Sequence, residues 1–210
     1  MKKYLLLFCP CLLLFSCSEN KTSKKEVTSV DSVSAAKPEN TSFIPVTSIL
    51  QNEITNLDSL PVTILEITSA NNKQDSAWLP VAKVKPKLQV FLSPVIDEKN
   101  MASLYKETKF NDQSTEAITF MYDPKTILPD SVSLRRWDVY FDPNRNIVRR
   151  VYIVKQAKEN NLSVTQQLTW KTGKSAKIVT LSNDKNVANP IITEKQWIWD
   201  LSEEIHCKSL

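Results

Sequence analysis

The stretch VSLRRWDVYFDPNRNIVRRVYIVKQ, residues 132–156, contains two β-rich segments separated by Asp142-Pro143-Asn144-Arg145-Asn146. Pro presets φ for a turn and Asn tolerates left-handed backbone, so this stretch predicts a hairpin of strands 132–141 and 147–156. Similar segments, separated by short polar turns, occur at 117–123, 162–170, 175–182 and 190–199. The sequence therefore predicts an antiparallel meander of about six strands.

The residues ahead of this meander carry helical and extended patterns. Val46, Leu50, Ile54 and Leu57 recur at helical spacing, which predicts an amphipathic helix that ends before Pro61. A strand is expected at 62–68 and a short helix at 97–106. The stretch from 75 to 92 is ambiguous, and a helix is expected in it from about residue 81. This order predicts an α+β fold class, with N-terminal helices packed on a twisted antiparallel sheet of about six strands. A curved half-barrel with an apolar interior is the alternative.

The hairpin also supplies the candidate ligand-binding face. If Phe141 lies opposite Ile147, antiparallel pairing places Asp138 opposite Arg150 and Arg136 opposite Tyr152. The candidate residues on this face are Arg136, Asp138, Tyr140, Arg150 and Tyr152, with Arg135 and Arg149 beside them. Guanidinium groups match carboxylate and phosphate oxygens in pairs, so the face suits such a ligand. The favoured interpretation is simpler: a solvated sheet face held by an Asp138–Arg150 ion pair.

The N-terminus has the pattern of an export signal. Lys2 and Lys3 precede an apolar run from Tyr4 to Phe15. Roughly 12 apolar residues are too few to cross a bilayer that needs about 20, so we expect a cleaved signal peptide rather than a permanent helical anchor. The chain is therefore expected to be exported.

Leu14-Phe15-Ser16-Cys17, at the end of that run, resembles a bacterial lipobox. The resemblance implies that Cys17 is lipidated and becomes the first residue of the mature chain, and several acyl chains would hold it on a membrane. Ser18, where an Asp signals inner-membrane retention in some bacteria, favours the outer membrane. Phe15 is bulkier than the usual occupant. The alternatives are an uncleaved anchor and an ordinary signal peptide with an incidental cysteine. The globular part resembles no characterised family and is expected to belong to a lipoprotein family of unknown role.

Composition suggests three consecutive regions: a signal peptide at 1–16, a lipidated disordered tether at 17–40 and a single globular domain at 41–210. The tether is rich in Ser, Thr, Lys and Glu, and has a reach of roughly 25 Å. The net charge is +4, and removal of Lys2 and Lys3 leaves +2, which does not favour nucleic acid. Cys207 would be the one thiol left in the mature chain, so no internal disulfide is expected.

Other motifs give weaker signals. Gly173-Lys174-Ser175 lacks the earlier glycine of a phosphate-binding loop, and we expect Gly173 to supply the positive φ of a hairpin turn. Glu203, His206 and Cys207 would share a helical face, yet a solvated tail is favoured over a metal site. The tryptophans on predicted strands, Trp137, Trp170, Trp197 and Trp199, are expected in the core, with a pocket for an acyl chain or glycan as the alternative. We predict no cofactor and no metal.

The sequence is compatible with three functions. The favoured one is a non-enzymatic envelope lipoprotein, held on the membrane by its lipid, whose sheet face binds another envelope protein or a glycan. The second is a carrier for a hydrophobic ligand, similar in general plan to periplasmic lipid-carrying half-barrels. The third is a hydrolase that uses carboxylates, for which no Asp or Glu spacing stands out.

Overall fold

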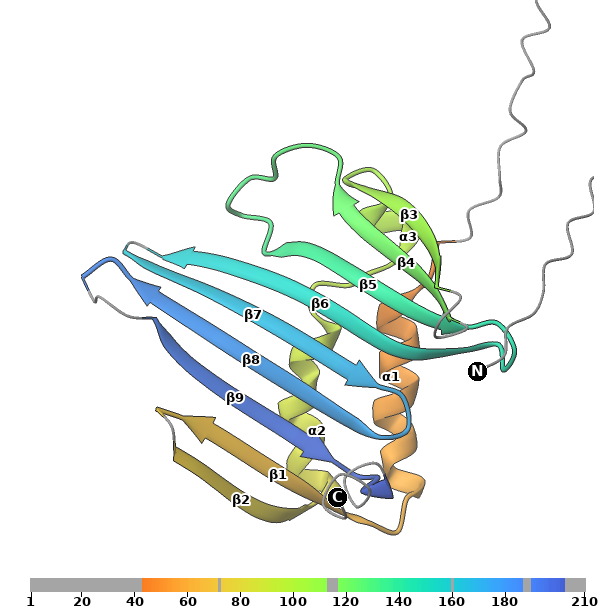
Figure 1. Ribbon diagram of the computed structural model, residues 1–210, viewed down its shortest axis with the longest axis vertical. Coiled ribbons are helices and arrows are strands. Elements are labelled where there is room, and N and C mark those ends of the chain that lie inside the picture. The colour runs from red at the N-terminus through yellow and green to blue at the C-terminus, as the bar shows by residue number, and fades with distance from the viewer. Residues whose placement is uncertain (1–42, 72, 113–116, 160, 187–189, 203–210) are drawn as a thin grey trace, which may run out of the picture. The chain divides into compact units, whose positions relative to one another are not determined.

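The computed structural model describes residues 43–71, 73–112, 117–159, 161–186 and 190–202. Its helices are α1 (Val46–Asn56), η1 (Leu57–Ser59), α2 (Val81–Leu88), η2 (Gln89–Leu92) and α3 (Glu98–Met101). Its strands are β1 (Thr63–Ala70), β2 (Lys73–Pro80), β3 (Tyr105–Asp112), β4 (Ala117–Pro124), β5 (Leu134–Asp142), β6 (Ile147–Glu159), β7 (Leu162–Lys171), β8 (Ser175–Asp184) and β9 (Ile191–Ile198). Figure 1 shows these strands as one sheet with α1 and α2 behind it.

The sheet is antiparallel throughout and has the order β2-β1-β9-β8-β7-β6-β5-β4-β3. Strands β3 to β9 form a meander in which each strand pairs with the next along the chain. The N-terminal hairpin β1–β2 extends the sheet at its other end, because β1 pairs with β9, from Leu65 opposite Ile198 to Ala70 opposite Thr193. The described sheet therefore has β2 and β3 as its edge strands.

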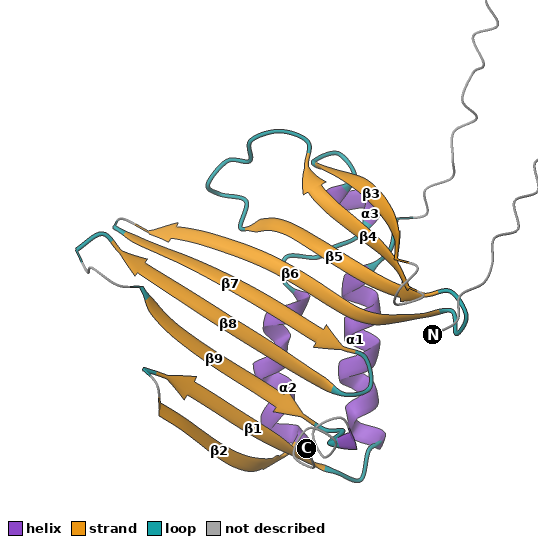
Figure 2. Cartoon of the chain, in the orientation of Figure 1, coloured by secondary structure: helices purple, strands orange, loops and turns teal. Residues whose placement is uncertain are grey.

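The helices lie on one face of the sheet because each has a narrow apolar stripe. Val46, Leu50 and Ile54, four residues apart, are buried in α1, and Val84 and Leu88 are buried in α2. Lys87 of α2 reaches the sheet, where its Nζ lies 2.5 Å from Glu66 Oε2 of β1. In Figure 2 the two helices lie side by side across the sheet.

The core fills the space between these helices and the sheet. Trp137, Trp170 and Trp197, from β5, β7 and β9, are at most 1% exposed. Trp199, just beyond β9, is 8% exposed and packs on Trp170, with ring centroids 5.2 Å apart. Phe91 meets Trp170 edge to face, with ring centroids 5.4 Å apart. The prediction of these tryptophans as core residues is confirmed.

The expected fold class is wrong. One sheet of nine strands dominates the described residues, and the helices are few and short, whereas we expected N-terminal helices on about six strands. The half-barrel alternative is not found either, since α1, α2 and the buried tryptophans occupy the face that would have been its interior. Helices and strands also alternate at the start of the chain, because β1 and β2 precede α2.

The strands missing from the prediction include both edges of the sheet. Seven of the eight residues of β2 are exposed. A strand with no buried face needs no alternating apolar residues, and the sequence KQDSAWLP has none. The sequence predicted a helix from Asp97 to Lys106, which overlaps the start of β3. Asp97 does cap a helix by accepting a hydrogen bond from Asn100 N, but that helix ends at Met101 and the chain is extended from Tyr105. An edge strand has one neighbour and little burial, which leaves a weak sequence signal.

The signal peptide and the tether that the sequence predicts, together with Cys17, lie outside the described residues. The described residues all belong to one compact unit. None of their helices is long and apolar enough to cross a membrane.

Candidate functional site

The β5–β6 hairpin, which carries the predicted binding face, turns where the sequence indicated. The Asp142 carboxylate accepts hydrogen bonds from the backbone N–H groups of Asn144, at 3.0 Å, and Arg145, at 3.1 Å. This arrangement is the reason Asp favours turns. Asn146 completes the turn with φ of 55°, in the left-handed region that Asn tolerates.

The register of the hairpin differs from the predicted one. Asp142, not Phe141, lies opposite Ile147, and a β-bulge between Tyr140 and Phe141 adds a further shift. Asp138 therefore lies opposite Tyr152 rather than Arg150. The predicted Asp138–Arg150 and Arg136–Tyr152 pairs are wrong for this reason.

Two β-bulges take two of the four arginines out of the register pairs of the β5–β6 ladder. Arg149 is the extra residue at the bulge beside Tyr140, and Arg135 is the extra residue at a second bulge beside Leu134. Arg135 instead lies 3.9 Å from Asp130. A bulge re-aims the side chains around it, which sequence alternation does not reveal.

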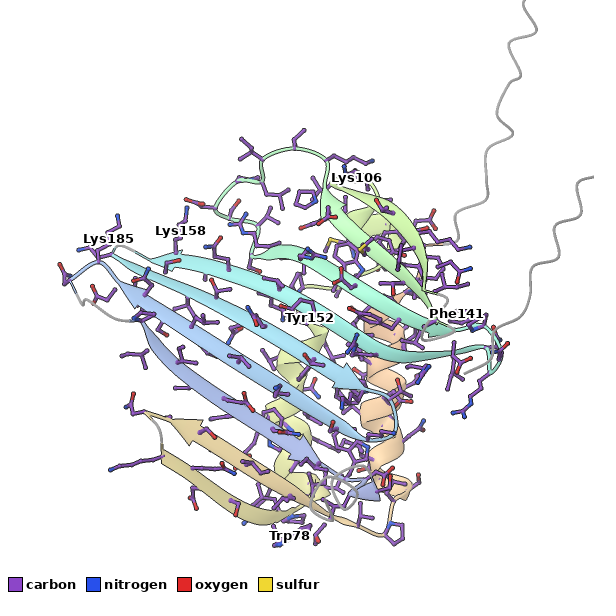
Figure 3. All side chains as sticks on the ribbon, viewed as in Figure 1. Trp78, Lys106, Phe141, Tyr152, Lys158 and Lys185 are labelled. Atoms are coloured by element: carbon purple, nitrogen blue, oxygen red, sulfur yellow. The ribbon has the colours of Figure 1, made fainter. Side chains whose placement is uncertain are left out.

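The remaining candidates lie on the sheet face opposite the helices. Across β5, β6 and β7 the register places Tyr140, Arg150 and Lys171 in one row and Asp138, Tyr152 and Thr169 in the next. These six residues, together with Arg136, are called the central patch below. Figure 3 shows its Tyr152 near the middle of the sheet, away from both edge strands. The structure therefore brings all five predicted residues together, with partners different from those expected.

Arg136 and Asp138 form an internally neutral pair. Arg136 Nη2 donates to both carboxylate oxygens of Asp138, at 2.9 and 3.1 Å. The Asp138 side chain is only 9% exposed, while that of Arg136 is 42% exposed. The pair raises the pKa of Arg136 above its ordinary value, chiefly through the hydrogen bond to Asp138. It thus adds almost no net charge to the central patch.

The first row supplies the positive charge. The guanidinium carbon of Arg150 lies 3.7 Å from the centroid of the Tyr140 ring, which is a cation–π contact. Lys171 lies directly opposite Arg150 across the β6–β7 ladder. The two side chains therefore place two positive charges in neighbouring positions of this row, where the oxygens of one anionic group can interact with both.

Tyr152 adds a neutral hydroxyl beside these cations. Burial raises the pKa of Tyr152, Asp138 and Tyr140 add to this effect, and Arg136 partly opposes it. The phenol therefore stays protonated at neutral pH and can donate a hydrogen bond. Two cations and one hydroxyl on one face of the sheet can bind an oxyanion.

The sequence supplied five residues of the central patch and missed Lys171 and Thr169. Both lie at the C-terminal end of β7, next to the turn that leads into β8. The predicted strands 147–156 and 162–170 left the β6–β7 register undefined, because β6 continues to Glu159, which pairs with Leu162. The residues of β6 that lie opposite Lys171 and Thr169 are set by the β6–β7 register, which places Arg150 and Tyr152 there.

Two further predictions meet different outcomes. Gly173 lies between β7 and β8 with φ of 70°, which confirms its role in a hairpin turn. Its backbone N–H donates to Glu53 Oε2 of α1 at 3.1 Å. Glu203, His206 and Cys207 lie outside the described residues. Within the described residues, no three His, Cys, Asp or Glu side chains are grouped as a metal site would require.

In comparisons with known proteins, no family model, no curated protein and no solved structure matches the chain.

Proposed function

We propose that this protein is a membrane-anchored envelope lipoprotein with a binding rather than an enzymatic role, and that the central patch holds an anionic group of another envelope component. The observation that carries the proposal is the row Tyr140–Arg150–Lys171, in which two cations face each other on an open part of the sheet. The partner group is a carboxylate or phosphate, on a protein or a glycan.

The rest of the molecule supports the use of this face. The opposite face of the sheet is covered by α1 and α2, whose apolar residues join the tryptophans in the core. The face with the central patch is half-buried along β6, β7 and β8, with polar and apolar side chains intermixed. Protein–protein contact surfaces commonly combine Tyr and Arg side chains in this way.

Site-specific photocrosslinking in native membranes tests the binding proposal. A photoreactive residue replaces Gln167, which register places on the same face, next to Val154 of β6. The expected result is one reproducible adduct that is lost in the double variant Arg150→Gln, Lys171→Gln and retained in Lys158→Gln. A photoreactive residue at the exposed Lys83 of α2 should give no such adduct. Identical adducts from Gln167 with and without the two charges would contradict the proposal.

The anchor is tested separately by intact mass of the protein from native membranes. Loss of residues 1–16 together with a triacyl increment on Cys17 is the expected result. An unacylated mature chain would refute the anchor, while leaving the binding test unaffected.

A further inference from the structure

A second site lies on the helix side of the sheet, away from the central patch. A cavity of about 250 Å³ opens beside the end of η2, next to the β5–β6–β7 ladder. Its lining consists of Val90, Ser93, Ser133, Lys155, Gln156, Ala157, Val164 and Gln166. Ser93 and Ala157 are exposed, so the cavity can be reached from solvent.

Lys155 is the one residue with an ionisable side chain in that lining. It lies in β6 opposite Gln166 of β7, and only 7% of its surface is exposed. Its Nζ donates hydrogen bonds to the backbone carbonyls of Val90 and Ser93. Those carbonyls belong to the end of η2, where helical partners are lacking. An ammonium group has three N–H donors, so one remains for a group inside the cavity.

This lysine is costly for a purely structural role. Buried lysines normally have a charged partner, and no carboxylate is present in the cavity lining. Burial alone lowers the pKa of Lys155 from 10.5 to about 8. A neutral hydrogen-bonding side chain would satisfy the η2 carbonyls without that cost. The position therefore has a buried cation beside a cavity whose lining contains no carboxylate.

We propose that this cavity binds a small monocarboxylate, with the Lys155 ammonium pairing with the carboxylate and the aliphatic walls covering its tail. The charge match is one to one. A phosphate dianion would leave a second negative charge uncompensated in the same lining. Val90, Ala157 and Val164 give the apolar surface for a short aliphatic tail, and Ser93, Ser133 and Gln166 give polar groups near the carboxylate.

Calorimetric titration of the full chain with hexanoate, compared with hexanol, tests the proposal. Hexanoate is expected to bind saturably with a stoichiometry of one, and hexanol to bind at least about tenfold more weakly, as the loss of a charge-assisted hydrogen bond implies. Lys155→Met should weaken hexanoate binding by a similar factor. Lys158→Met removes a lysine of the same strand that is exposed and pairs with Asp130, and should bind like wild type.

Two further measurements separate a ligand site from a structural lysine. Ala157→Phe places a ring at the exposed rim and should abolish binding while the thermal midpoint stays near that of wild type. Hexanoate affinity should fall more than about tenfold between about pH 7 and about pH 9.5, as Lys155 loses its proton. No saturable hexanoate binding to wild type, or equal binding by wild type and Lys155→Met, would overturn the proposal.

Discussion

At the scale of single residues, Lys155 makes stability depend on pH. Its pKa is about 8 in the folded chain and near 10.5 when unfolded, so above pH 8 the unfolded state holds the extra proton. The free energy of unfolding must then rise as the pH increases from 8 toward 10.5. Below pH 8 the folded state bears the full cost of burying the charged ammonium group. Between about pH 7 and about pH 9.5 the free energy of unfolding should increase by about 2 kcal/mol from this group.

Urea unfolding at both pH values, with Lys155→Met as reference, measures this effect. The variant lacks the titrating group, so the difference in unfolding free energy between wild type and variant should change by that amount. Lys158→Met serves as the matched control and should follow wild type. A difference that does not vary with pH would show that Lys155 keeps an ordinary pKa.

Sequence patterns identified the residues of the central patch by type but could not reveal Lys155 as unusual. Lys155 follows the apolar run Val151-Tyr152-Ile153-Val154, and alternation alone places it on the core face. A lysine near the end of a strand, as Lys155 is in the predicted strand 147–156, ordinarily reaches solvent. Its burial depends on η2, which covers it from a distant part of the chain, and strand periodicity carries no information about that contact.

At the scale of elements, the β7–β8 turn tests the role of its glycine. Gly173 has φ of 70°, and a Cβ added there would meet nothing within 4 Å. Gly173→Ala should therefore destabilise the protein through backbone strain alone, by about 1 kcal/mol. The measurement is the urea midpoint at unchanged slope. Asn146→Gly, at the β5–β6 turn with φ of 55°, relieves strain of the same kind and should be neutral or slightly stabilising. Equal stability of Gly173→Ala and wild type would show that the turn relaxes.

Strand positions were predictable where a strand has two neighbours and a buried face. The segments at 117–123, 147–156, 162–170 and 175–182 correspond to β4, β6, β7 and β8 within a few residues. Their alternating Val, Ile, Leu and Trp residues reflect burial against the helices. Edge strands β2 and β3 lack that burial, and the bulges at Arg135 and Arg149 depend on both strands of the ladder together. Neither property is encoded in a local pattern.

At the scale of the whole molecule, the β1–β9 pair joins the two ends of the described chain. Trp197 Nε1 donates to Glu66 Oε2 at 2.6 Å across this pair, and Lys87 binds the same carboxylate. Trp197→Phe should cost about 1 to 3 kcal/mol, because a partly buried carboxylate loses a donor and a large ring becomes smaller. Trp170→Phe is a matched control, since Trp170 is equally buried and its Nε1 has no hydrogen-bond partner.

Urea unfolding of both variants checks this prediction, with Trp197→Phe expected to be the less stable. If Trp170→Phe were as destabilising as Trp197→Phe, ring volume rather than the hydrogen bond to Glu66 would explain the loss. The sequence could not supply this pairing, because about 130 residues separate its partners and no local pattern indicates which strand lies beside 62–68.

The same pair has a consequence for how the chain reaches its final form. Synthesis delivers α1, β1 and β2 first, yet the strand that completes β1 is among the last residues described. Until β9 is available, one side of β1 has no ladder partner and the apolar stripe of α1 has only part of its sheet. Contacts this distant in sequence make folding slow, and leave strand edges open for association with other chains. The fold can thus be completed only after its C-terminal strand has been made, which gives any factor that holds unfolded chains a long period in which to act.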